Sequence, residues 1–155
     1  MTAEAVSAAT TVREIMTRNP LCVGPDIGAR ELARDLEANE ISGMPVTDGL
    51  DRVIGVVSRT DLLHRMVQGP LGTRRSSFFE SLAEGLSNDE SHPDNLGTVE
   101  DFMTPEPVTA GPDDLVVDVA HRMAEDHIHR IVIVNDGRQV LGIVTTLDLL
   151  RVFPR

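Results

Sequence analysis

Two short stretches, 87 residues apart (142 − 55), decide the fold: residues 55–61 read GVVSRTD and residues 142–148 read GIVTTLD. The same offset, without a gap, aligns residues 11–63 with residues 98–150. Each copy is too short to bury its apolar strands well alone, and two copies packed together solve that problem. The chain is therefore predicted to be an internal duplication.

Each copy carries one amphipathic helix in the middle of its sequence. Apolar residues recur there at spacings of three and four, a pattern typical of a helix that packs by one stripe. Pro25-Asp26 and Pro112-Asp113 are expected to begin these helices, with Asp26 as an N-cap. The two stripes are Ala29, Leu32, Ala33 and Leu36 in the first copy and Val116, Val119, Ala120 and Met123 in the second.

Short apolar runs predict the strands: residues 21–23, 44–47 and 53–57 in the first copy, and 130–134 and 140–144 in the second. The run 53–57 is expected to be buried on both faces. Residues 135–138 are expected to form a hairpin turn with Gly137 at positive φ. Helices over 58–67 and 145–153 close the copies. The predicted class is mixed α+β, with two pseudo-symmetric β-α-β-β-α repeats packed sheet to sheet.

The expected domain organisation has four parts. Residues 1–10 form a flexible N-terminal tail, 11–67 the first repeat, 68–97 an insert and 98–153 the second repeat. The insert is expected to hold a short amphipathic helix around Phe78 and Phe79, with Ser77 and Glu80 as a capping box, and then an acidic loop. That helix would either cover exposed core or dock a second subunit or partner.

Composition excludes several classes of function. A net charge of −11 disfavours nucleic-acid binding, and the absence of Trp and Tyr removes stacking platforms. No apolar run approaches the ~20 residues of a membrane span, and no secretory signal is seen. The single cysteine, Cys22, rules out a disulfide framework and a CxxC motif. A cytoplasmic protein without a membrane partner is expected.

The recurrent G-h-h-S/T-x-x-D unit, where h is apolar, has residue types that suit a nucleotide. Glycine allows a ligand or another backbone to come close. A hydroxyl residue at the start of a helix lies beside unpaired N–H groups that favour phosphate. An Asp in the first turn can accept hydrogen bonds from a ribose diol. Ser58 with Asp61, and Thr145 with Asp148, would also form helix capping boxes, and the two interpretations are compatible.

The repeat resembles the CBS (cystathionine-β-synthase) domain family, as a tandem pair or Bateman module. The residues that carry the resemblance are Val12, Met16, Thr17, Pro25, 44–46 and 55–61, with Val99, Met103, Thr104, Pro112, 131–133 and 142–148 in the second copy. The resemblance implies a stand-alone regulatory module that binds AMP, ADP, ATP or S-adenosylmethionine in the clefts between the repeats. It also implies dimers of such pairs.

The resemblance assigns candidate nucleotide-binding residues to each copy. In the second copy, His129 and Arg130 add side chains that can bind phosphate. In the first copy, the position aligned with Arg130 is Gly43, which adds no side chain. We therefore expect the second site to be the better one. Its residues are Thr104, Val108, His129, Arg130, Ile131, Thr145 and Asp148; those of the first are Thr17, Met44, Pro45, Ser58 and Asp61.

The sequence is compared with three classes of function: a sensor, a structural module and an enzyme. The favoured one is a nucleotide sensor that requires no cofactor, forms a homodimer and signals in trans to an unidentified protein partner. The alternative is a structural or oligomerisation module with empty clefts. An enzyme is disfavoured, because no residues supply a base, a nucleophile and an oxyanion site together. A metal site is also not expected, since the spacing of His121, His127 and His129 matches no compact ligand set.

Overall fold

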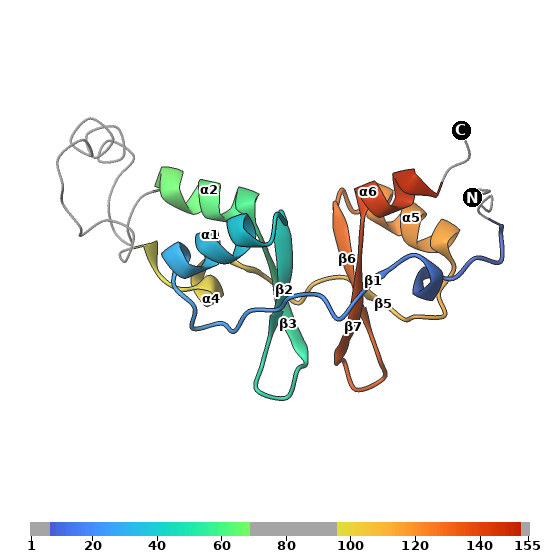
Figure 1. Cartoon of the computed structure of the whole chain (residues 1–155), viewed down its shortest axis with the longest axis horizontal. Coiled ribbons are helices and arrows are strands. Elements are labelled where there is room, and N and C mark those ends of the chain that lie inside the picture. Colours follow the sequence, from blue (N-terminus) through green and yellow to red (C-terminus); the bar gives the residue numbers. More distant parts are fainter. Residues whose placement is uncertain (1–6, 69–95, 153–155) are drawn as a thin grey trace. The chain divides into compact units, whose positions relative to one another are not determined.

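The computed structural model describes residues 7–68 and 96–152, which form two compact units (Figure 1). Among the described residues, the first comprises 7–21, 49–53 and 106–152, and the second comprises 22–48, 54–68 and 96–105. The units therefore cross the boundaries of the two repeats. The predicted insert helix, with its Ser77–Glu80 capping box, lies outside the described residues.

The first unit is built on a four-stranded sheet in the order β1-β7-β6-β5. Strand β5 is parallel to β6, while β6 with β7 and β1 with β7 are antiparallel. Figure 1 shows α5 and α6 on the same face of this sheet. The elements are η1 (Val12–Glu14), β1 (Thr17–Arg18), β5 (Thr109–Ala110), α5 (Val116–Glu125), β6 (Arg130–Val134), β7 (Val140–Thr145) and α6 (Thr146–Arg151).

The second unit has a three-stranded sheet in the order β2-β3-β4, with β4 antiparallel to β3. The strand predicted at residues 21–23 is reduced to one parallel bridge between Val23 and Val46. The elements are α1 (Ala29–Ala38), β2 (Gly43–Thr47), β3 (Val53–Ser58), α2 (Arg59–Gln68), α4 (Val99–Phe102) and β4 (Thr104–Pro105). The mixed α+β class and the order of strands and helices predicted from the sequence are confirmed.

The opening segment of each repeat packs in the unit formed by the other repeat. Val12 donates its N–H to Asp114 O at 2.9 Å, and Val99 donates to Ile27 O at 2.8 Å. Both valines are fully buried, Val12 in the cluster with α5 and β6 and Val99 in the cluster with α1 and β2. Each core is thus completed by residues far away in the sequence. We call residues 11–18 and 98–105 the exchanged segments, because each packs in the unit formed by the other repeat.

This exchange corrects the predicted helix starts. The N-cap residues are Gly28 and Leu115, so Asp26 is not an N-cap and α5 does not begin at Pro112-Asp113. The carbonyl groups of Pro25 and Ile27 accept hydrogen bonds from Glu100 and Val99, so this stretch is paired with the exchanged segment and the helix begins after it. The same pairing occurs in the first unit.

Burial confirms most of the two predicted stripes. Val116, Val119 and Met123 are buried, as are the first-repeat residues Ala29, Leu32 and Leu36. Ala33 is exposed, which corrects its assignment to the stripe. Strand β3 is also less enclosed than predicted, since its residues alternate between buried and half-buried. One face of β3 therefore carries most of its packing.

The hairpin between β6 and β7 differs from its prediction at one residue. Arg138, with φ of 63°, takes the left-handed conformation that was expected of Gly137. Arg138 N–H closes the turn on Asn135 O at 2.9 Å, and Asn135 Oδ1 accepts from Gln139 N–H at 2.9 Å. The turn is thus closed at the left-handed residue itself, and the chain then leads through Gln139 into β7.

Candidate functional site

The turn from β7 into α6 is held by a reciprocal pair of side chains. Asp148 Oδ2 accepts from Thr145 N–H at 2.8 Å and from the Thr145 hydroxyl at 3.0 Å. Thr145 Oγ1 in turn accepts from Asp148 N–H at 3.3 Å. This is the capping box that the sequence indicated, and it fixes both polar side chains at the end of the strand.

The turn from β3 into α2 repeats this geometry in the second unit. Asp61 Oδ2 accepts from Ser58 N–H at 2.8 Å and from the Ser58 hydroxyl at 2.9 Å, and Asp61 N–H donates to Ser58 Oγ at 3.2 Å. The two turns are thus chemically equivalent, and both capping boxes predicted from the sequence are present.

The capping box leaves part of each carboxylate's hydrogen-bonding capacity for other groups. A carboxylate has two oxygens and about four acceptor positions, and the box uses Oδ2. Asp148 Oδ1 lies 3.9 Å from Arg151 Nη1, and the Asp148 side chain is 15% exposed. A half-buried carboxylate of this kind, held in one rotamer, can accept hydrogen bonds from a diol.

The glycine of each motif is contacted by a methionine of the other repeat, a pairing that the sequence analysis missed. A Cβ atom on Gly142 would lie 2.5 Å from Met16 Sδ and 2.9 Å from Thr17 O. A Cβ atom on Gly55 would clash with Met103 Sδ and lie 3.0 Å from Thr104 O. Each glycine is therefore needed for the close approach of the exchanged segment.

The exchange also corrects the grouping of the two threonines. Thr17 pairs with Ile143 on β7, so it lies in the unit that holds Thr145 and not with Ser58. Thr104 pairs with Val56 on β3, in the unit that holds Ser58. The threonines were assigned to the opposite copies because each lies close in sequence to its own repeat.

Arg130 and Thr145 are cross-strand partners at the open end of the β6–β7 pair. Arg130 is half-buried and His129, just before it, is exposed. Thr146, the first residue of α6, lies against the same edge, because its N–H donates to His129 O at 2.9 Å and its hydroxyl donates there at 3.2 Å. The structure thus gathers hydroxyl, carboxylate and cationic groups at this end of the sheet.

Three other predicted site residues lie in the interior. Ile131 and Met44 are buried in the two hydrophobic clusters, and Pro45 is buried between Met44 and Val46. Their side chains therefore stabilise the fold. Val108, immediately before β5, is 37% exposed.

Arg59 is a further candidate that the sequence pattern did not single out, although it stands inside the motif GVVSRTD. Arg59 is the first residue of α2 and is exposed. Its N–H donates to Ser42 O at 2.9 Å, which matches the bond from Thr146 to His129 in the other unit. Arg59 therefore lies at the same edge of its turn as Thr146 does.

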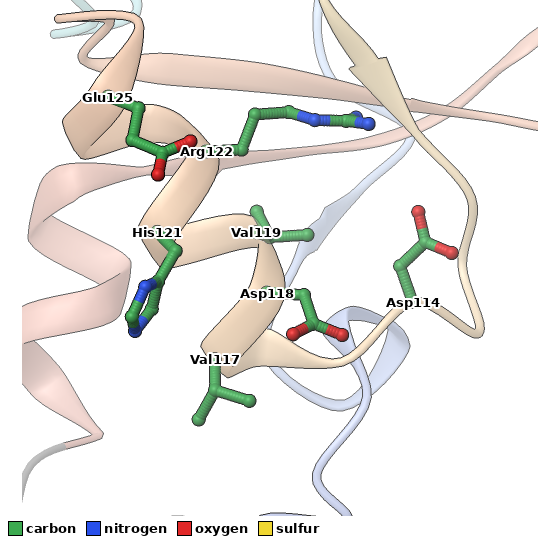
Figure 2. A pocket seen from close by; sticks show the side chains of 7 residues that line it. All are labelled: Asp114, Val117, Asp118, Val119, His121, Arg122 and Glu125. Atoms are coloured by element: carbon green, nitrogen blue, oxygen red, sulfur yellow. The ribbon is translucent and has the colours of Figure 1, made fainter.

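A separate pocket of about 520 Å³ lies along α5 (Figure 2). Some of its polar groups hold the preceding loop: Arg122 Nη1 donates to Thr109 O at 2.8 Å, and Asp114 Oδ2 accepts from Gly111 N–H at 2.9 Å. None of the predicted nucleotide-binding residues lines it. Its lining residues are Asp114, Val117, Asp118, Val119, His121, Arg122 and Glu125.

Neither a metal cluster nor a membrane span is found in the described ranges 7–68 and 96–152. No three His, Cys, Asp or Glu side chains gather there in a way that could hold a metal ion, His121, His127 and His129 included. Within the same ranges, no helix has the length and hydropathy that crossing a bilayer requires.

Known proteins with similar sequences are mostly larger. The chain is 26% identical over 147 residues to L-aspartate semialdehyde sulfurtransferase of Methanocaldococcus jannaschii, covering 95% of this chain and 24% of that enzyme. It is 27% identical to the uncharacterized protein MJ1426 of the same organism, covering 90% of this chain and 88% of that protein. The chain thus spans about a quarter of the first relative and most of the second.

Solved structures show the same fold. The CBS domain pair of protein MJ0100, in complex with 5′-methylthioadenosine and S-adenosyl-L-methionine, superposes with a TM-score of 0.70 at 26% identity, covering 92% of this chain and 94% of that one. CBSX2 in complex with AMP gives 0.69 at 24% identity, with 91% and 93% covered. The CBS domain family matches residues 12–68 and 99–155, and the chain therefore belongs to that family, with two copies of the domain.

Proposed function

We propose that the chain is a non-catalytic regulatory module that senses an adenine nucleotide, or a related ligand such as S-adenosylmethionine, at the turns that contain Ser58 and Thr145. The observation that carries this proposal is the duplicated turn, in which a hydroxyl and a carboxylate are fixed side by side at the end of a buried strand. The methylthioadenosine and S-adenosylmethionine bound by the MJ0100 pair support an adenine-containing ligand.

The residues suggest a division of roles. Asp148 and Asp61 would accept hydrogen bonds from the ribose hydroxyls, and Thr145 and Ser58 would contact the ribose or the phosphate. At the second repeat's turn, His129 and Arg130 would bind phosphate, since a guanidinium matches the geometry of that group. The exchanged segments would add Thr17 to the Thr145 site and Thr104 to the Ser58 site.

The backbone near the interior residues would hold the base. Ile131 in one unit, and Met44 and Pro45 in the other, belong to the strands that lead into the sites, and Val108 is exposed just before β5. Met44, Ile131 and Val108 would bring backbone polar groups to an apolar surface, which suits adenine. Pro45 would add only apolar surface, because it has no N–H and its carbonyl accepts from Val23 N–H at 3.0 Å.

Regulation requires that the ligand bind one arrangement of the protein better than another. We propose that this difference is transmitted in trans to a protein partner, that the working form is a homodimer in the cytoplasm, and that no cofactor is needed. We also propose the boundaries 11–67 and 98–153 for the two repeats, with the insert 68–97 between them.

The test is isothermal titration of the chain with AMP, ADP, ATP and S-adenosylmethionine, each up to millimolar concentration. At least one is expected to bind, and Asp148→Ala is expected to weaken that binding. Asp118→Ala, an exposed carboxylate on α5, is the matched control and should leave binding unchanged. Absence of heat with all four ligands would refute the sensor.

A structural module with empty sites is the competing function. It would bind none of these ligands and would act through protein contact alone. Ligand-induced thermal stabilisation separates the two, because a ligand at one hundred times its Kd stabilises the folded state by about 2.7 kcal/mol. A structural module would show no shift in Tm.

A further inference from the structure

The two ligand sites differ in where they carry an arginine. In the second repeat, Arg130 begins β6 and pairs with Thr145 across the strands. The aligned position in the first repeat is Gly43, which has no side chain to offer. At the first residue of the closing helix the arginine is in the other repeat. This residue is Arg59 in the first repeat and Thr146 in the second.

These two positions are neighbours at one edge of each turn. The backbone N–H of the helix residue donates to the carbonyl of the residue that precedes the strand start, from Thr146 to His129 and from Arg59 to Ser42, at 2.9 Å in both units. A side chain at the helix position can therefore reach this edge, as the Thr146 hydroxyl does when it donates to His129 O. An arginine at either position therefore starts from the same edge of its turn.

Arg59 is also available for a ligand. It is exposed, and within the part of the chain that the structure describes its guanidinium makes no hydrogen bond or ion pair. Asp61 lies in the same helical turn with Oδ2 directed at Ser58, so a phosphate at this edge needs a cation to offset the carboxylate. Helix α2 has ten residues, and its N-terminus adds a partial positive charge.

We infer that Arg59 binds the phosphate of the nucleotide at the first repeat's turn and so takes the part that Arg130 plays at the second. This inference rests on the proposed function. It makes both sites competent for phosphorylated ligands, whereas the sequence analysis favoured the second. Because guanidinium contacts phosphate and not the nucleoside, Arg59 distinguishes AMP from adenosine.

The test is an NMR titration of the ¹⁵N-labelled full chain with AMP and, separately, with adenosine. Amides of residues 55–61 report on the first site and those of 142–148 on the second. Arg59→Ala is expected to weaken AMP binding at the first site about tenfold, the size of a charge-assisted hydrogen bond. Adenosine binding at the first site, and AMP binding at the second, should not change.

Two further variants sharpen the result. Arg59→Lys keeps the charge without the bidentate fork and should retain part of the AMP affinity. Arg34→Ala removes an exposed arginine on α1 and should change neither site. An equal loss for AMP and adenosine in Arg59→Ala, or no loss at all, would overturn the role of Arg59.

The outcomes also separate this inference from the function on which it rests. AMP shifts confined to residues 142–148 would leave the sensor intact and overturn the inference about Arg59. The absence of shifts with either ligand at both turns would overturn both.

Discussion

The two units have similar backbone conformations but carry different charges. Left-handed residues recur at the repeat offset, although their side chains are unrelated. Their φ values are 48° at Asn19 and 47° at Glu106, 53° at Glu40 and 54° at His127, and 60° at Asp51 and 63° at Arg138. The duplicated fold therefore constrains conformation more strongly than side-chain chemistry.

The difference in charge between the units lies at exposed or half-buried positions. Arg59 faces Thr146 in the alignment, Gly43 faces Arg130, and Arg13 faces Glu100. Several buried positions keep the same residue instead, as with Val12 and Val99, or Val57 and Val144. Packing preserves the fold in both units, while the exposed positions are free to change the ligand or partner that each unit takes.

The largest expected effect comes from adding a Cβ atom at the two glycines that a methionine contacts. Gly142→Ala would place a Cβ atom against Met16 Sδ and, at 2.9 Å, against Thr17 O, which is backbone. We expect a loss of about 3 kcal/mol in the free energy of unfolding, from overpacking. Urea denaturation measures it, and Gly55→Ala should behave alike because Met103 and Thr104 lie against it in the same way.

Gly49→Ala is the control, since nothing lies within 4 Å of the added Cβ and φ is not positive there. Its change should stay within about 0.5 kcal/mol. If Gly142→Ala were equally mild, the methionine contact would not hold the exchanged segment.

The next effect tests the exchange itself. Val12→Ala should cost about 2 kcal/mol, because it removes two methyl groups from a fully buried site. Although Val12 belongs to the first repeat by sequence, we expect amide protection to fall in β6 and β7. Val99→Ala should lower protection in β2 and β3 instead. Hydrogen exchange by NMR measures both.

The opposite pattern, in which each substitution loosens its own repeat, would contradict the exchange. Leu147→Ala is a suitable control, since this leucine is 56% exposed and its loss should leave the protection of all four strands unchanged.

The sequence alone predicts much of this fold, but it does not predict the exchange of the opening segments. The central strands and the closing helices follow from local apolar patterns, and both capping boxes follow from residues three apart. Which sheet edge accepts Thr17 or Thr104 depends on contacts with residues far away in the sequence. The predicted helix starts, at Pro25 and Pro112, come too early for the same reason. The carbonyl groups before Ala29 and Val116 pair with the exchanged segments, so the helices begin only after them.

A smaller effect compares the two turns. Thr145→Ala and Ser58→Ala each remove the cap hydroxyl and should cost about 1 kcal/mol of stability. Equal losses in thermal denaturation are expected, because the distances in the two boxes agree closely. Thr145→Ser and Ser58→Thr keep the hydroxyl and should be almost neutral. A large loss in one unit alone would mean that the two turns are not equivalent.

The smallest effect concerns a charged pair that the repeats do not share. Arg13 Nη2 lies 3.0 Å from Asp113 Oδ1 in the first unit, with the two side chains 46% and 83% exposed. The backbone of the second unit is equivalent, since Glu100 N–H bonds to Pro25 O as Arg13 N–H bonds to Pro112 O, both at 3.0 Å. There, however, the aligned residues are Glu100 and Asp26, which repel each other.

Glu100→Arg should therefore recreate the first unit's ion pair in the second and stabilise the chain by about 0.5 kcal/mol, the modest value of a solvent-exposed pair. Arg13→Glu should destabilise it by a similar amount. Both changes should shrink as salt is raised toward 1 M, where the Debye length is about 3 Å. Urea denaturation at low and high salt measures them. A gain from Glu100→Arg that does not depend on salt would assign it to packing and not to charge.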